Sequence, residues 1–159
     1  MPASRQEIVD AYRKARQQAE ELVASASESA WSRGAYEQGW NARQLLCHIA
    51  DSCGVARFLI AYAKDPRPLP AGVEFDIDKW NAQQVALREG KSIQDLLTEL
   101  QVNIGREVEA IEAAPDALLS GQTRAPWGDE GTLGDLIMGT ISDHFHMHLA
   151  DLRTATGPG

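Results

Sequence analysis

The sequence predicts an all-α protein folded as a four-helix bundle, and three observations carry this prediction. Apolar residues recur every three or four positions in four long segments. Each segment opens with a side chain that can cap a helix and a partner three residues later. No segment alternates long enough for a strand ladder, which disfavours a doubly wound or barrel fold. The capping pairs are Ser4 and Glu7, Asn41 and Gln44, Ser92 and Asp95, and Thr132 and Asp135.

The first two predicted helices cover about Ser4 to Ser27 and Ala42 to Lys64. The second ends before Pro66, since proline cannot continue a helix. Their apolar positions form one seam each, of the kind that packs in a bundle. The first seam is Ile8, Ala11, Ala15, Ala19, Leu22 and Ala26, and the second is Leu45, Ile49, Ala56, Leu59 and Ile60.

The last two long helices are expected over about Ile93 to Ala114, before Pro115, and over about Leu133 to Thr154. A shorter extra helix, from Ile77 to Arg88, is expected before the third long one. The two seams are Ile93, Leu96, Leu97, Leu100, Ile104, Val108 and Ile111, and Leu133, Leu136, Ile137, Ile141, Leu149 and Leu152. The connecting segments are too short to hold another domain, so residues 1–159 are expected to form a single bundle domain.

Composition narrows the classes of function. The chain has 159 residues, of which 43% are hydrophobic, enough to close a core without disulfides. Its formal charge of -8 works against a nucleic-acid partner. The apolar runs are shorter than a membrane span and the first residues show no signal region, so neither a membrane partner nor export is expected. Cys47 and Cys53 point to different faces of one helix, which fits a cytoplasmic protein.

Three of the four histidines fall in one stretch of the last helix. His144 and His148 are four residues apart, so both imidazoles can reach one metal ion, whereas His146 points elsewhere. Ile137 and Ile141 lie seven residues before them, which places the pair on the apolar seam. A buried imidazole pair must be satisfied, and a shared metal is one solution. Hydrogen-bonded core histidines are the alternative, as is an exchange of roles with His146.

The remaining histidine, His48, lies on a polar stripe of the second helix, with Gln44 before it and Asp51 and Ser52 after it. Two polar stripes on core-facing helices suggest that the stripes face each other. Three neutral imidazoles would leave a coordination position open, as in a catalytic metal site. Taken alone, His48 would instead be a capped or solvated histidine.

The segment from Trp40 to Asp51 resembles the helix 2 histidine motif of the DinB-like metal-binding four-helix bundles. Gly131 to Ile137, with Trp127 before it and the His144 and His148 pair after it, is similar to the last helix of that family. This family includes the N-terminal bundle of mycothiol-dependent maleylpyruvate isomerase and the bacillithiol S-transferases. The segment Phe75 to Asn81 resembles the mycothiol branch.

The resemblance implies that His48, His144 and His148 ligate a divalent metal, with water or a thiol completing the shell. It implies a small-molecule substrate, and a homodimer, since family members are frequently dimers. The isomerase has an additional C-terminal domain, so single-domain members are the closer expected analogues. Catalytic residues beyond the ligands are unknown from the sequence.

The leading hypothesis is a metal-dependent enzyme that transfers a low-molecular-weight thiol to a small electrophile, or isomerises one. A metal-dependent hydrolase and a non-catalytic metal-binding or small-molecule-binding bundle are the alternatives. Zinc and nickel both suit three imidazoles. Asp51 and Asp151 lie three residues after a predicted ligand, where each can accept a ring N–H, place a substrate or simply be solvated.

The cysteine and the tryptophans near the predicted ligands each allow a functional and a structural interpretation. Cys47, beside His48, invites a thiol-catalysis hypothesis, but adjacent helix residues diverge by about 100°, which favours packing. Trp40, Trp80 and Trp127 stand at loop–helix junctions, where tryptophan most often covers a core and less often lines a pocket.

Overall fold

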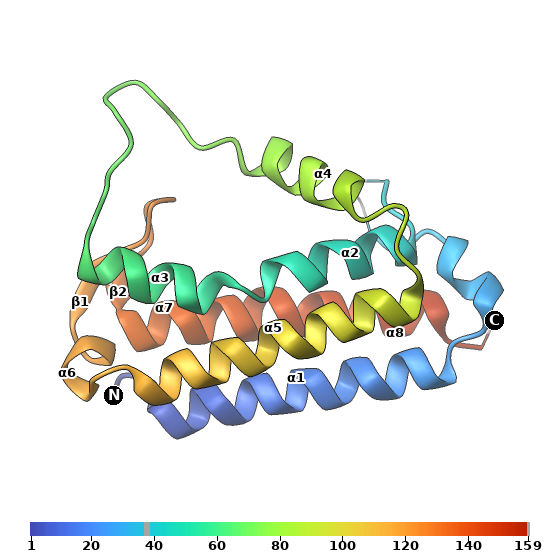
Figure 1. The fold of residues 1–159 in the computed structure, drawn as a ribbon, viewed down its shortest axis with the longest axis horizontal. Coiled ribbons are helices and arrows are strands. Elements are labelled where there is room, and N and C mark those ends of the chain that lie inside the picture. The colour runs from blue at the N-terminus through green and yellow to red at the C-terminus, as the bar shows by residue number, and fades with distance from the viewer. Residues whose placement is uncertain (37–38, 159) are drawn as a thin grey trace.

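Four helical rods lie side by side in the computed structural model, which describes residues 1–36 and 39–158 (Figure 1). The rods are α1 (Arg5–Ser25), α2 (Ala42–Ser52) with α3 (Val55–Lys64), α5 (Ile93–Ala113), and α7 (Leu133–Gly139) running through a π-helical turn, η2 (Thr140–Phe145), into α8 (His146–Thr156). α1 packs on α5 and α8, and α2 packs on the same two helices, so the rods close a ring around one core. The predicted four-helix bundle is confirmed.

The directions in which the four rods run explain the long connection between α3 and α5. In Figure 1, α1 and the α7–α8 rod run from left to right, whereas the α2–α3 rod and α5 run from right to left. Because the α2–α3 rod and α5 are consecutive rods of the bundle and run in the same direction, residues 65–92 must return along its length. This crossover contains the predicted extra helix, α4 (Ile77–Leu87), which packs against α2.

The capping residues act as their sequence positions predict. Ser4, Asn41, Ser92 and Thr132 each accept a hydrogen bond from the amide three residues later. These bonds satisfy amides that have no partner inside a helix. Four of the helix starts are therefore fixed by local chemistry alone.

The core follows the predicted seams. Leu45, Ile49, Leu100, Ile104 and Ile137 are each no more than 1% exposed. Burying each such side chain favours folding by about 1.5–3 kcal/mol relative to an exposed one. Both cysteines are buried free thiols, so no disulfide joins them across this core.

The second predicted helix is broken in two, which the sequence pattern did not indicate. The chain turns at Cys53 and Gly54, and α3 then begins without a capping side chain of its own. Glu107 of α5, fully buried, supplies the missing acceptor: its Oε2 accepts a 2.7 Å hydrogen bond from the Arg57 amide, and the Arg57 guanidinium also donates to it. A residue of a neighbouring rod therefore caps α3.

A small antiparallel hairpin corrects the expectation that no strand ladder is present. Its strands are β1 (Gln122–Arg124) and β2 (Glu130–Thr132), with Gln122 opposite Thr132. Three residues a strand are too few to show an alternating pattern. Gly128, with φ +110, allows the turn between them. The connections also contain a 3-10 turn, η1 (Glu28–Ser32), and the one-turn helix α6 (Asp116–Leu119).

The stretch Ala42–Lys64 has the length and apolar composition of a membrane span, with a mean hydropathy of 1.3. Within the fold, 56% of its most apolar window is buried, and the stretch is interrupted at Gly54. It is a core rod of this bundle.

Candidate metal centre

The three histidines singled out by the sequence meet between α2 and the last rod. The Nε2 atom of His144 lies 3.1 Å from Nε2 of His48 and 3.1 Å from Nε2 of His148. One ligand atom from each of the three residues lies within 4.8 Å of the others. His48 and His148 are buried, and His144 is half-buried. The predicted convergence of His48 with the pair on the last helix is confirmed.

The π-helical turn η2 sets the direction of this pair. Core residues of the last rod recur at steps of four, at Leu133, Ile137, Ile141, Phe145 and Leu149. In a regular α-helix, each step of four turns the side chain about 40° past a full circle. The wider turn of η2 absorbs this drift, and it contains His144. A run of buried apolar residues spaced four apart, four times in succession, is the sequence pattern that indicates this π-helical turn.

The geometry of the triad fits a metal ion better than a set of hydrogen bonds. A ring nitrogen carries either one N–H or one lone pair, so Nε2 of His144 cannot satisfy both neighbours. Ligand bonds of ~2.1 Å at angles between 90° and 109° place two nitrogens about 3.0–3.4 Å apart. The observed 3.1 Å separations fall in this interval. The three side chains can therefore hold a divalent cation.

The electrostatics of the site favour neutral rings, which are the form that binds metal. Burial, followed by the neighbouring His144 and His148, lowers the pKa of His48 to about 3. Burial and His148 lower the pKa of His144 to about 4. Burial also lowers the pKa of His148, against the opposing influence of Asp151. At neutral pH all three lone pairs are available without loss of a proton.

Two aromatic rings from the segment before α2 cover the triad. The ring of Trp40 is centred 5.1 Å from that of His48, and Tyr36 meets His148 edge-on at 5.0 Å. Next to His148 is a cavity of about 280 Å³, lined by Ala35, Tyr36, Met147 and Asp151. Tyr36 and Met147 escaped the sequence analysis because no local pattern marks them. The triad is thus shielded by aromatic rings and adjoined by a small cavity.

The two candidate carboxylates have different surroundings. Asp151 Oδ2 lies 3.6 Å from Nδ1 of His148, and Asp151 also lines the cavity. Asp51 instead lies on the side of α4, where its Oδ1 is 3.3 Å from Arg88 Nη2. Burial raises the pKa of Asp51, although Arg88 opposes this. The structure therefore brings only Asp151 close to a ligand histidine.

The expectation that His146 points away from the triad is confirmed, whereas the expected role of two tryptophans is not. His146 is half-buried, and its Nδ1 lies 3.1 Å from Gln18 Oε1, away from the triad. Trp80 and Trp127 are nearly half exposed, so their expected role as core covers is wrong. Trp127 stacks against Phe58 at the hairpin end of the bundle instead.

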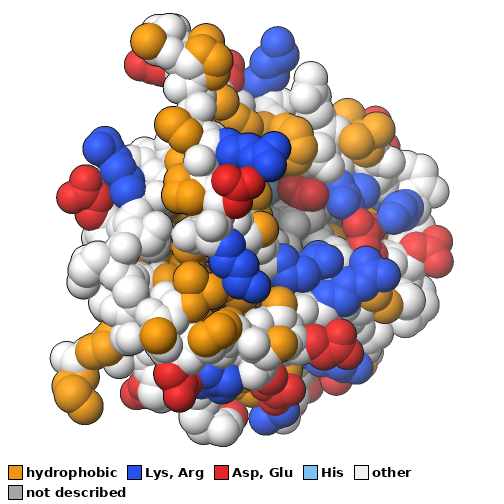
Figure 2. Space-filling model, turned by 60° about the vertical axis from the view of Figure 1, so that its left-hand side comes forward, with side chains coloured by type: hydrophobic (Ala, Val, Ile, Leu, Met, Phe, Trp, Pro, Cys, Tyr) orange, Lys and Arg blue, Asp and Glu red, His pale blue; other side chains and the backbone are white. Residues whose placement is uncertain are grey.

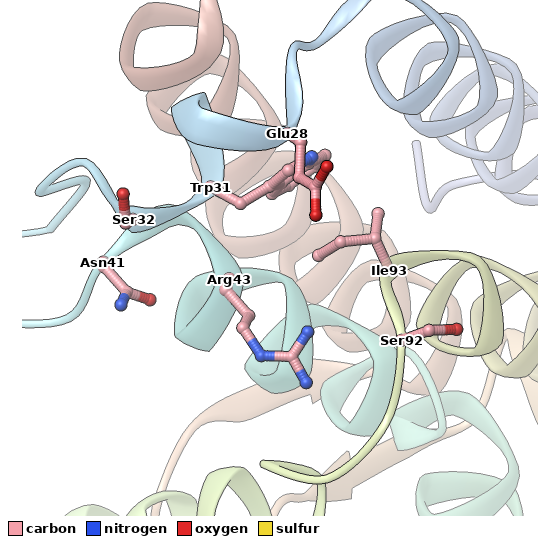
Figure 3. Close-up of a pocket in the computed structure, with 7 residues that line it drawn as sticks. All are labelled: Glu28, Trp31, Ser32, Asn41, Arg43, Ser92 and Ile93. Atoms are coloured by element: carbon pink, nitrogen blue, oxygen red, sulfur yellow. The ribbon is translucent and has the colours of Figure 1, made fainter.

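A second hollow, of about 380 Å³, lies at the start of α2 and α5 (Figure 3). The carboxylate of Glu28 and the guanidinium of Arg43 reach toward the same space. Arg43 also donates hydrogen bonds to the carbonyls of Glu89 and Lys91, which tie α2 to the start of α5. None of the triad residues lines this hollow.

The sequence of residues 12–153 matches the family described as the mycothiol maleylpyruvate isomerase N-terminal domain. The chain belongs to this family. The match contains all three histidines, the whole of α2, and all but the last three residues of α8. Among curated proteins, none matches this chain.

Solved structures share the fold of this chain. The mycothiol-dependent maleylpyruvate isomerase is 15% identical, with a TM-score of 0.72 over 94% of this chain and 60% of the isomerase chain. This chain therefore spans less than two thirds of the isomerase. YfiT from Bacillus subtilis, described as a probable metal-dependent hydrolase with an unusual four-helix bundle topology, is 18% identical, with a TM-score of 0.71 over 95% and 85% of the two chains.

A third structure concerns the expectation that nucleic acid is not a partner. The colibactin self-resistance protein ClbS, solved in complex with a dsDNA, is 14% identical, with a TM-score of 0.73 over 98% and 96% of the two chains. At this identity the likeness concerns the fold alone. On the face shown in Figure 2, Asp and Glu side chains lie among the Lys and Arg side chains.

Proposed function

We propose that this protein is a metal-dependent enzyme that joins a low-molecular-weight thiol to a small electrophile or uses the thiol to isomerise one. The observation that supports this proposal is the convergence of the His48, His144 and His148 Nε2 atoms at separations suited to one cation. Three ligands leave a fourth position for an exchangeable group. A purely structural site would close that position with a fourth side chain.

Each part of the site has a role in this proposal. A bound divalent ion supplies Lewis acidity, which lowers the pKa of a thiol or water at the open position. His48, His144 and His148 provide neutral nitrogen ligands. Asp151 Oδ2 lies 3.6 Å from Nδ1 of His148, which has no hydrogen-bond partner, so a small rotation of the Asp151 side chain would let it accept the N–H of that ring and orient it. Tyr36 and Trp40 limit the access of bulk water.

The cavity beside His148 sets the size of the substrate. Its volume of about 280 Å³ lies just below the range of ligand pockets, which span roughly 300–1,000 Å³. Met147 and Ala35 offer apolar contact, while Asp151 and Tyr36 offer polar groups. We expect a compact substrate with a short polar end.

Metal-dependent hydrolysis is the second candidate, and the position of Asp151 favours it. A carboxylate that lines the cavity next to a ligand histidine can hold a proton from a nucleophilic water. The description of YfiT as a probable hydrolase points in the same direction. A non-catalytic metal-binding bundle is the third candidate.

The deciding experiment detects whether a thiol binds at the open coordination position of the metal. Purified protein is assayed for metal, loaded with cobalt, and titrated with several bacterial thiols while its absorption spectrum is recorded. We expect a sulfur-to-cobalt charge-transfer band that is lost in His148→Ala and kept in His146→Ala. Full metal occupancy with no thiol band would shift the assignment to hydrolysis or to a non-catalytic role.

Three finer properties belong to the same proposal. The metal is zinc or nickel, because both accept imidazole ligands. The protein works in the cytoplasm, as its free buried thiols suggest, and forms a homodimer, as the family resemblance implies. Elemental analysis and light scattering of the purified protein test the metal and the dimer.

A further inference from the structure

Two buried polar atoms on one face of α2 lack a hydrogen-bond partner among the residues that the structure describes. They are Nδ1 of His48 and Oγ of Ser52. The two residues are four positions apart in a regular helix, so their side chains stand one above the other. Two adjacent buried groups without partners call for one common explanation.

Metal ligation through Nε2 would dictate where the His48 proton lies. Its Nε2 faces Nε2 of His144, so a lone pair on Nε2 requires the proton on Nδ1. Nδ1–H is then a buried donor that needs an acceptor. Histidines that bind metal nearly always give this second N–H to an oxygen, which fixes the tautomer and the ring orientation.

Other polar groups on this face of α2 are already engaged. The Gln44 side chain accepts a hydrogen bond from the Asn41 amide within the capping box. Asp51 Oδ1 lies against Arg88 on the side of α4. Among these groups, Ser52 is the one whose buried oxygen has no hydrogen-bond partner, and a hydroxyl can accept as well as donate.

The other buried ligand histidine shows the same design. Nδ1 of His148 lies 3.6 Å from the carboxylate of Asp151, three residues later on its own helix. His48 and Ser52 repeat this arrangement on α2 with a neutral oxygen. Each buried ligand thus has an Nδ1 without a hydrogen-bond partner and an oxygen-bearing side chain about one helical turn toward the C-terminus.

We infer that Ser52 is a positioning residue. Its hydroxyl does not yet contact Nδ1 of His48 in this structure, and it accepts the Nδ1–H after a rotation of its side chain or through one bridging water, thereby presenting Nε2 to the metal. This inference rests on the proposed function. It concerns the ring of His48 even before metal binds, so the two can be tested apart.

The test uses the metal-free protein and then zinc. Long-range proton–nitrogen NMR spectra at pH 7 report which nitrogen of His48 carries the proton, and competition with a chelator gives the Kd for zinc. In the unmodified protein we expect the Nδ1–H tautomer. In Ser52→Ala we expect a larger Nε2–H population and a zinc Kd raised about 10-fold, the lower end for loss of an outer partner.

Matched variants separate this role from packing. Ser52→Thr keeps the hydroxyl and should retain both the tautomer and the affinity, whereas Ser52→Val, of the same shape, should lose both. This pair decides the question if Ser52→Ala fails to fold. Ser25→Ala, at the last residue of α1, should change neither measurement.

The outcomes distinguish the inference from the function. An unchanged His48 tautomer in both Ser52→Ala and Ser52→Val overturns the inference, whatever happens to the zinc Kd. A changed tautomer in a protein that binds no zinc supports the role of Ser52 and refutes the proposed metal site. If the Ser52 variants bind zinc and keep the His48 tautomer unchanged, the result supports the metal site and shows that Ser52 does not position His48.

Discussion

His48 and His144 are 96 positions apart in the chain, yet their Nε2 atoms lie 3.1 Å from each other. The contact exists because α2 packs directly against α8 and because η2 turns His144 toward α2. Both rings are desolvated, which keeps them neutral and ready to bind a cation. The first prediction tests this juxtaposition.

Replacing His144 by Ala should remove the bound metal and leave the bundle folded. The ring supplies the nitrogen that lies 3.1 Å from each of the other two, but the core closes without it. We expect zinc affinity to fall by more than about 100-fold, the upper end for loss of an outer partner. Metal content and circular dichroism are measured on one sample, with His146→Ala as the matched control. Unfolding of His144→Ala would indicate a structural metal instead.

Replacing Gly134 by Ala should destabilise the protein although alanine favours helices. An added Cβ would lie 2.9 Å from the carbonyl oxygen of Ala3 and 3.3 Å from that of Leu119. Such overpacking against backbone costs about 1–3 kcal/mol. Gly139→Ala is the control, because its Cβ would meet only the Asp143 carboxylate at 3.8 Å. Urea denaturation that ranked the two variants in the opposite order would contradict this packing.

Replacing Glu107 by Ala should lower the free energy of unfolding by about 2–3 kcal/mol. The change leaves the Arg57 amide and guanidinium without their buried acceptor. The loss should be smaller than the ~3–5 kcal/mol of a fully buried pair, because the Arg57 side chain is 40% exposed and can reach water. Glu109→Ala, an exposed position on the same helix, should change stability by less than about 0.5 kcal/mol. Equal effects of the two variants would exclude a capping role for Glu107.

The stability contributed by Glu99 should disappear in acid. Burial raises the pKa of this carboxyl, but hydrogen bonds and charges from Arg88 and Lys91 outweigh burial and hold its pKa below the ordinary value. A lowered folded-state pKa stabilises the protein above the unfolded-state pKa, and this stabilisation is lost as the pH falls below it. Glu99→Gln should therefore be about 1 kcal/mol less stable at pH 7.

This difference should shrink as the pH falls below about 4.5, the region in which an unfolded glutamate takes up its proton. Denaturation curves of both proteins at pH 7, 5, 4 and 3 give the comparison. A gap that stayed constant down to pH 3 would mean that packing, and not charge, explains the effect of Glu99.

Much of the fold could be predicted from interactions between residues that are close together in the sequence. Ser4, Asn41, Ser92 and Thr132 start their helices with their own side chains, and apolar spacing marks the buried face of each rod. These signals act within four residues, so they do not depend on the rest of the chain. The break before α3 was missed because its cap, Glu107, comes from another rod. The hairpin was missed because three residues a strand carry no periodicity.

The candidate site also has features that local sequence determines and features that depend on tertiary packing. The sequence by itself determined that His144 and His148 share a helix face, because a spacing of four residues brings two side chains together in any α-helix. Only the tertiary structure decided that His48 joins them, that Asp51 turns to Arg88 while Asp151 stays beside His148, and that Tyr36 covers the site. These relationships depend on how the rods and loops pack against each other, and packing contacts between distant residues leave no periodic trace in a single sequence.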